Sequence, residues 1–189
     1  MDKIINEVEK AYKVLINGGV ILYPTDTIWG LGCDATNNNA INKINSLKER
    51  ENTTPMLSLI NSSDMLNGFL HEKPQNIDDL LKKFKNPTTI VYDNPKNISE
   101  LLISNKNKVA FRIVNHNFCN MLIDKIKKPI VSTSANIHNE KHPVNFKEID
   151  ERILKGVDYI VNLPDKSISN FPSSIIRVNE KGEIDLEVL

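Results

Sequence analysis

The spacing of hydrophobic residues along the chain changes repeatedly between that of a helix and that of a strand. From residue 2 to residue 16, apolar side chains recur every three or four positions, which predicts an amphipathic helix that ends at residues 17–19. The apolar run at residues 20–23 is typical of a short buried strand. Residues 25–38 are rich in turn formers, so we expect turns and loops there.

The same alternation continues to the end of the chain. It predicts further helices at about 39–50, 63–70, 76–84, 118–126 and 147–154, and further strands at 56–60, 88–92, 109–114, 129–132, 157–161 and 174–178. Helices and strands do not follow a strict βαβ rhythm, so we expect one α/β domain over residues 1–189, with a mixed sheet flanked by helices. Ligands of such folds bind where strand ends open into loops, which directs attention to the loops after Tyr23, Arg50 and Val131.

Charge and composition exclude several classes of protein. The 24 Lys and Arg residues balance 24 Asp and Glu residues, so no overall charge attracts the chain to nucleic acid. Cys33 and Cys119 are too few for a disulfide framework or a cysteine-based zinc site, and the histidines have no metal-ligand spacing, so we expect no protein-held metal. We find no apolar run of membrane-spanning length and no signal peptide, which predicts a cytoplasmic protein without membrane contact.

Arginine is rare among the basic residues. Lysine is far more common, and arginine occurs only at Arg50, Arg112, Arg152 and Arg177. In a lysine-rich chain, an arginine indicates a place where the planar guanidinium is needed, for example to bind phosphate or carboxylate with two hydrogen bonds.

Five segments carry side chains suited to ligand binding, and each also has a purely structural interpretation. They are the Thr- and Gly-rich turn at 24–32, the cations Lys48 and Arg50 at a helix end, Arg112 within an apolar strand, the polar turn 132–136, and the hydroxyl turn 172–174. The turns could be self-capping networks, the cations could serve the helix dipole, and Arg112 could face solvent. No Ser-His-Asp triad and no Walker-type phosphate loop is present.

Taken in order, these segments resemble the threonylcarbamoyl-AMP synthase family, also called YrdC-like. The resemblance lies in GGVILYPTDTIWGLGCDA, INSLKER with Pro55, KNPTTIVY, VAFRIVNH, KPIVSTSAN and FPSSIIRV, which together span residues 18–178. It implies a twisted sheet with a concave ligand-binding surface, in the short single-domain form of the family. It also implies an enzyme, a nucleotidyltransferase that makes threonylcarbamoyl-AMP and pyrophosphate from L-threonine, bicarbonate and ATP with Mg²⁺, for the threonylcarbamoyladenosine modification of tRNA.

The resemblance also assigns roles to individual residues. Lys48 and Arg50 occupy the catalytic, ATP-facing pair, and Thr54, Thr89 and Asn136 fall at further ATP-binding positions. The positions that match threonine-binding residues are Thr27, Arg112, Ser134, Ser173 and Ser174. Two departures stand out. His138-Asn139 replaces the Ser-Gly that follows Ser-Ala-Asn in the family, and the C-terminal Leu-Arg-x-Gly is absent.

Two other functions remain open from the sequence. A YrdC-like RNA-binding protein without catalysis would use the lysine-rich segments 82–85 and 125–128 on phosphates, and would bind tRNA in a strongly salt-dependent way. A related carbamoyl-adenylate-forming domain would take carbamoyl phosphate in place of threonine. If the chain is instead a threonylcarbamoyl-AMP synthase, protein partners in tRNA modification are expected.

Overall fold

Helix α1 (Asp2–Ile16) opens the chain where its amphipathic pattern predicts it. Just beyond its end lies Gly18, whose φ is +76° and whose N–H bonds to the carbonyl of Leu15 at 3.0 Å. Glycine adopts this left-handed conformation without a steric cost, so it is the usual residue just beyond a helix end. The computed structural model describes residues 2–50, 56–164, 173–178 and 183–184.

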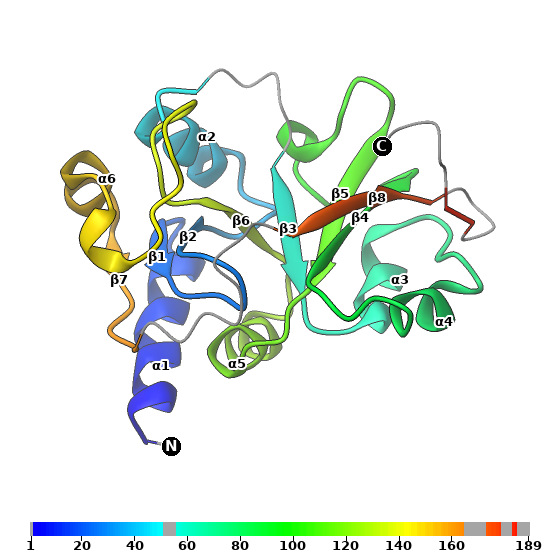
Figure 1. Ribbon diagram of the computed structural model, residues 1–189, viewed down its shortest axis with the longest axis horizontal. Coiled ribbons are helices and arrows are strands. Elements are labelled where there is room, and N and C mark those ends of the chain that lie inside the picture. The colour runs from blue at the N-terminus through cyan, green and yellow to red at the C-terminus, as the bar shows by residue number, and fades with distance from the viewer. Residues whose placement is uncertain (1, 51–55, 165–172, 179–182, 185–189) are drawn as a thin grey trace.

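The described strands form one mixed sheet in the order β7-β1-β2-β6-β3-β5-β4-β8 (Figure 1). The pairs β1–β7, β3–β5 and β4–β8 are parallel, and the other neighbours are antiparallel. The mixed-sheet α/β prediction is therefore confirmed. The strands are β1 (Ile21–Tyr23), β2 (Gly30–Gly32), β3 (Leu57–Ile60), β4 (Thr88–Asp93), β5 (Lys108–Ile113), β6 (Ile130–Ser134), β7 (Tyr159–Ile160) and β8 (Ser174–Arg177).

In the part of the chain that the structure describes, five helices follow α1, and most are shorter than predicted. They are α2 (Asn38–Leu47), α3 (Leu66–Phe69), α4 (Ile77–Leu81), α5 (Asn117–Ile126) and α6 (Glu151–Gly156), with single 3₁₀ turns at Ser63–Met65, Glu100–Leu102 and Phe146–Glu148. The predicted helices at 63–70 and 147–154 each divide into a 3₁₀ turn and a short α-helix. Within the described residues, no helix is both long and apolar enough to cross a membrane.

Strand β2 lies inside the turn-rich segment 25–38, where the sequence does not predict a strand. Glycine has a low intrinsic preference for strands, so Gly30-Leu31-Gly32 gives no strand signal of its own. The neighbouring strands impose its conformation, because Gly32 pairs with Ile21 of β1 and Gly30 pairs with Ser134 of β6. A Cβ atom on Gly32 would lie 2.7 Å from the carbonyl oxygen of Val131 and 2.6 Å from the ring of Tyr23. Glycine is therefore needed for the close approach of these strands.

The Gly32→Ala variant should accordingly unfold more easily than the wild type. An added methyl group in a full interior typically costs about 1–3 kcal/mol, and here one of the atoms it meets is backbone and cannot rotate away. Urea denaturation of both proteins measures the difference. Gly68→Ala is the matched control, because nothing lies within 4 Å of a Cβ atom at that position. Equal midpoints for Gly32→Ala and the wild type would contradict the packing argument.

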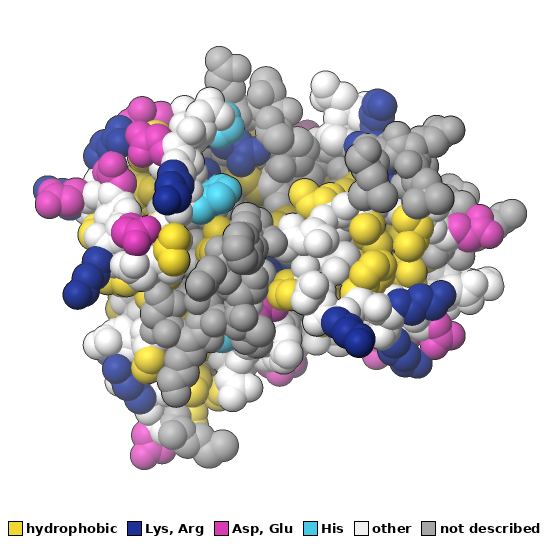
Figure 2. Space-filling model, in the orientation of Figure 1, with side chains coloured by type: hydrophobic (Ala, Val, Ile, Leu, Met, Phe, Trp, Pro, Cys, Tyr) yellow, Lys and Arg dark blue, Asp and Glu magenta, His cyan; other side chains and the backbone are white. Residues whose placement is uncertain are grey.

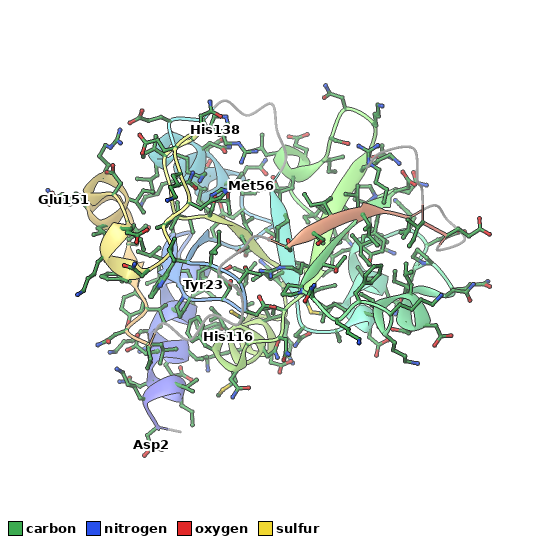
Figure 3. The ribbon with its side chains drawn as sticks, viewed as in Figure 1. Asp2, Tyr23, Met56, His116, His138 and Glu151 are labelled. Atoms are coloured by element: carbon green, nitrogen blue, oxygen red, sulfur yellow. The ribbon has the colours of Figure 1, made fainter. Side chains whose placement is uncertain are left out.

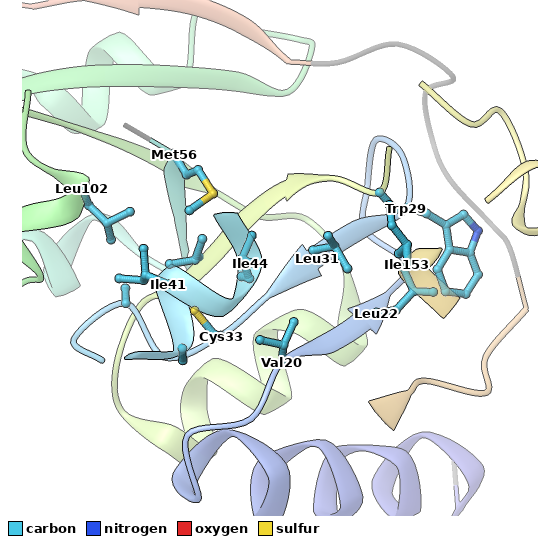
Figure 4. Close-up of a cluster of buried hydrophobic side chains, with 14 of the residues drawn as sticks. Val20, Leu22, Trp29, Leu31, Cys33, Ile41, Ile44, Met56, Leu102 and Ile153 are labelled. Atoms are coloured by element: carbon cyan, nitrogen blue, oxygen red, sulfur yellow. The ribbon is translucent and has the colours of Figure 1, made fainter. Parts of the chain in front are cut away.

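Helices cover both faces of the sheet but leave part of one face open. Helices α1 and α5 lie side by side and share a buried cluster with Ile21, Tyr23 and Ile130 (Figure 1). On the opposite face, α2 and α6 bury Leu22 and Leu31 (Figure 4), and α3 and α4 bury Phe111 of β5. On β4, β5 and β8, every second side chain packs under α3 and α4, and the side chains between them face a cavity on the other side of the sheet.

Candidate functional site

A cavity of about 880 Å³ lies over the open part of the sheet. Its floor is the face of β4, β5 and β8, and its walls are the loop at 27–30, the end of β6, the loop at 103–106 and the histidine loop at 138–142. Met56 and His138 both line it, and both lie toward the upper edge in Figure 3. A concave site of this size is large enough for a nucleotide-sized ligand.

Cations gather at the cavity although the chain as a whole is neutral. Among the described residues, five cations line it: Arg50, Lys106, Lys108, Arg112 and Arg177. Among the described residues that line it, none is Asp or Glu. Lys108 also pairs with Asp93 at 2.6 Å, which reduces its share of the field. Converging cations in a partly enclosed site attract anions such as phosphates and carboxylates.

The four arginines lie where we expect them from the sequence, beside carboxylates or at a site that could bind anions. Three of them, Arg50, Arg112 and Arg177, line the cavity. The fourth, Arg152, lies on the surface, where its guanidinium contacts Glu49 and Asp150 at 2.8 Å and Glu140 at 3.2 Å. Every arginine side chain thus faces either carboxylates or the cavity.

Arg112 is held by a buried ion pair. Its Nη1 lies 2.8 Å from Oδ1 of Asp26, and the two side chains are only 3% and 2% exposed. The other oxygen of Asp26 accepts a hydrogen bond from the N–H of Asn115 at 3.0 Å. A buried guanidinium needs an anionic partner, and Asp26 supplies one while fixing the position of Arg112 at the cavity floor. Asp26 lies inside the Pro-Thr-Asp-Thr turn, and nothing in the sequence marks it as the partner of Arg112.

The Thr25–Thr27 turn leaves the hydroxyl of Thr27 as an acceptor. Thr25 Oγ1 donates its proton to the carbonyl of Ile28 at 2.8 Å and accepts the N–H of Thr27 at 3.0 Å. Thr25 Oγ1 also lies 3.0 Å from Thr27 Oγ1, so the proton in that contact must come from Thr27. The lone pairs of Thr27, which lines the cavity, are then available to a ligand that donates a hydrogen bond.

Lys48 and Arg50 diverge because the backbone reverses between them. Helix α2 ends at Leu47, and Glu49 takes the left-handed conformation with φ +52°. The N–H of Glu49 bonds to Ser46 O, and the N–H of Arg50 bonds to Asn45 O, which is the Schellman pattern of a helix C-terminus. Arg50 therefore reaches the cavity, while Lys48 is 3% exposed and is not among the cavity-lining residues.

The hydroxyl turn near the C-terminus contributes one of its two predicted side chains. Ser173 lines the cavity, and its Oγ lies 2.7 Å from Oγ1 of Thr89. Ser174 is not among the cavity-lining residues, so its role in threonine binding stays a prediction. Successive residues of a strand point to opposite faces, and Ile175 and Arg177 share the cavity side with Ser173.

The other predicted site residues fall into three groups. Ser134 lines the cavity. Asn136 lies one layer behind it, because its amide group donates to the carbonyls of Ile137 at 3.0 Å and Glu140 at 2.7 Å. Thr54 lies outside the described residues. His138 and His142 line the cavity too, although nothing in the sequence leads us to expect either of them in a ligand site.

Comparison with known sequences agrees with the motifs on which this site is built. The Sua5/YciO/YrdC family model, described as "Telomere recombination", matches residues 13–186. A threonylcarbamoyl-AMP synthase from Hahella chejuensis is 31% identical over 178 residues, which cover 94% of this chain and 96% of that protein. A second one, from Saccharophagus degradans, is 32% identical over 135 residues, or 71% of each chain.

Solved structures show the same architecture. The crystal structure of P. abyssi Sua5 complexed with L-threonine superposes with a TM-score of 0.82 at 26% identity, over 90% of this chain. This chain spans 50% of the length of that Sua5 protein. E. coli YciO, at 19% identity and a TM-score of 0.74, has the same fold. The chain belongs to the Sua5/YciO/YrdC family.

Proposed function

We propose that this chain is a threonylcarbamoyl-AMP synthase, an enzyme that converts L-threonine, bicarbonate and ATP into threonylcarbamoyl-AMP and pyrophosphate. The observation that carries the proposal is the single cavity that brings Arg50, Arg112 and Ser134 together from three distant parts of the chain. The names of the relatives support it, as does the likeness to a Sua5 structure that contains L-threonine. We also propose that residues 1–189 act as one domain.

The reaction needs positioned charges more than it needs a protein nucleophile. The neutral amine of threonine attacks bicarbonate, with loss of water, and becomes a carbamate. A carbamate oxygen then attacks the α-phosphorus of ATP, and pyrophosphate leaves. Both steps bring anions together, so fixed cations and hydrogen-bond donors lower their barriers.

The end of the cavity near Arg112 is suited to threonine. Arg112, fixed by Asp26, and the hydroxyl of Ser134 would hold the carboxylate, which leaves the amine free to react. Thr27 would accept a hydrogen bond from the substrate hydroxyl. A carboxylate and a guanidinium form paired, directional hydrogen bonds, so this contact fixes the orientation of the amino acid.

Replacing Thr27 with valine should weaken the preference for threonine over valine. Valine keeps the shape of the side chain but removes the acceptor that would read the substrate hydroxyl. Loss of one such hydrogen bond costs about 1.4 kcal/mol, so we expect kcat/KM for threonine to fall about tenfold. Thr27→Ser is the matched control, because it keeps the hydroxyl. An unchanged ratio of threonine to valine turnover in Thr27→Val would remove Thr27 from substrate recognition.

Arg50 and Thr89 are the residues we propose for ATP, and Ser173, which contacts Thr89, stays a proposal for threonine. Arg50 offers a planar guanidinium to the phosphates, and burial lowers the pKa of that group, so a neighbouring anion would reduce the cost of keeping it charged. Thr54 and Asn136 remain predictions for ATP from the resemblance, and Ser174 remains one for threonine although its side chain lies on the other strand face.

Mg²⁺ enters this proposal as part of the substrate. Among the residues that the structure describes, no three His, Cys, Asp or Glu side chains gather in a way that could hold a metal ion. The phosphates of ATP are themselves good ligands for Mg²⁺, so we propose that the ion arrives on ATP and screens the charge of the leaving pyrophosphate. Transfer of the product to tRNA, with partner proteins, and the cytoplasmic location stay predictions.

The test is to incubate the protein with ATP, Mg²⁺ and bicarbonate, adding each amino acid in turn, and to detect the adenylate by mass. The proposal predicts an adenylate and pyrophosphate with L-threonine only. An adenylate formed from carbamoyl phosphate would instead identify the carbamoyl-adenylate-forming domain. Salt-sensitive tRNA binding with no turnover would identify an RNA-binding protein.

The lysine-rich segments give the RNA-binding alternative little support. Lys82 pairs with Asp79 at 2.9 Å, Lys125 pairs with Glu9 at 2.6 Å, and Lys128 pairs with Asp34 at 2.6 Å. Basic and acidic side chains intermingle on the face shown in Figure 2, without one continuous basic surface. Half of the six lysines in these two segments therefore have a carboxylate partner.

A further inference from the structure

Lys48 is buried beside the site, and its ammonium group is already bonded to three oxygens. Its Nζ donates to the carbonyl of Ser134 at 2.6 Å, to the carbonyl of Asn136 at 2.7 Å, and to Oδ1 of Asn136 at 3.3 Å. A lysine ammonium has three protons, so these contacts use all of its donors. None is left for a phosphate in the cavity.

The backbone of Lys48 holds the same segment from its other side. Its carbonyl accepts the N–H of His138 at 2.8 Å. Lys48 therefore ties the C-terminal end of α2 to residues 134–138 through both its side chain and its main chain. The Schellman reversal at Glu49 directs the side chain of Lys48 inward while the next cation, Arg50, goes to the cavity.

The segment that Lys48 holds is a wall of the site. Ser134 and His138 both line the cavity, and Ser134 pairs with Gly30 of β2 on its other side. The amide of Asn136 is turned so that its nitrogen donates to two carbonyls, which leaves its oxygen to accept from Lys48. Without the ammonium group, the buried carbonyls of residues 134 and 136 would lose their shared donor, and the wall would shift to find another.

We propose that Lys48 is a positioning residue, whose ammonium group fixes the Ser134–His138 wall so that Ser134 meets the carboxylate of the amino acid substrate. This inference rests on the proposed function, and it gives Lys48 a different role from the phosphate contact that its place beside Arg50 suggests. Burial away from water and the nearby charge of Arg50 lower the pKa of Lys48 to about 8.

The experiment measures threonine and nucleotide binding separately by calorimetry in Lys48→Met and Arg50→Met. The inference predicts that Lys48→Met raises the Kd for L-threonine tenfold or more and changes the Kd for a non-hydrolysable ATP analogue with Mg²⁺ less than threefold. Arg50→Met should show the opposite pattern. Lys43→Met, on the exposed side of the same helix, is the control and should leave both constants unchanged. A nucleotide defect in Lys48→Met as large as that in Arg50→Met would overturn the inference.

Two further readouts separate positioning from loss of the fold. Amide hydrogen exchange of the peptide containing residues 132–140 should be at least tenfold faster in Lys48→Met and unchanged in Lys43→Met. Lys48→Gln, which keeps two side-chain donors, should restore part of the threonine affinity. Unchanged exchange in Lys48→Met would refute the inference even if that variant were inactive. Wild-type protein that binds neither threonine nor the ATP analogue would refute the proposed function instead, whereas the exchange test would still decide the role of Lys48.

Discussion

Substituting methionine for Arg112 is expected to abolish threonine-dependent release of pyrophosphate and to destabilise the fold by about 3–5 kcal/mol. The substitution removes the guanidinium that would bind the threonine carboxylate. It also leaves Asp26 buried without the partner that lies 2.8 Å away. Both effects follow from the position of one side chain, which joins a buried carboxylate to the floor of the cavity.

The double variant Asp26→Asn, Arg112→Met separates these two effects. Asparagine keeps an oxygen that can accept the N–H of Asn115, but it carries no charge that needs a partner. We expect the double variant to recover most of the lost stability, measured by urea denaturation, and to remain inactive. Activity near that of the wild type in the double variant would show that Arg112 does not bind substrate.

Arg112→Lys tests the geometry of the contact. Lysine keeps the positive charge, so Asp26 retains an ionic partner and the fold should lose less stability than with methionine. A lysine ammonium cannot bind two carboxylates through a planar fork, and we expect the KM for threonine to rise at least tenfold while the KM for ATP changes little. Equal KM values for threonine in this variant and the wild type would mean that charge alone is sufficient.

The sequence predicts the main elements of the fold because most are specified locally. The periodicity of α1, the glycine that follows it and the apolar run of β1 each appear within a few consecutive residues. Strand β2 could not be predicted in this way, because its glycines have no strand preference and its conformation comes from pairing with β1 and β6. Its two partner strands are separated from each other by about half of the chain.

The candidate site shows the same division between local and long-range information. Arg50, Arg112 and Ser134 could be identified from residue type and motif, and each lines the cavity. Strand alternation explains why Ser173 lines the cavity and Ser174 does not, but the exact register could not be read from the sequence. The roles of Asp26 and Lys48 depend on contacts across 86 positions or more, such as Lys48 with Ser134, so only the folded chain reveals them.

The second large effect is expected at Arg50. Replacing it with alanine should lower threonine-dependent release of pyrophosphate about 10²- to 10³-fold, the usual cost of removing one group that stabilises developing charge in an enclosed site.

Arg50 can be removed without dismantling the fold. Its backbone N–H, which closes the end of α2 on Asn45, is kept in alanine, and its side chain is only partly buried, so we expect little change in stability. Arg152→Ala is the matched control, since this arginine is bound to surface carboxylates outside the cavity and its loss should leave activity near that of the wild type. The measurement is the rate of pyrophosphate release by the wild type, Arg50→Ala and Arg152→Ala at saturating threonine, with the ATP concentration varied. If Arg50→Ala kept more than a third of the wild-type rate, the cation that faces the cavity from the end of α2 would not be part of the machinery that acts on ATP.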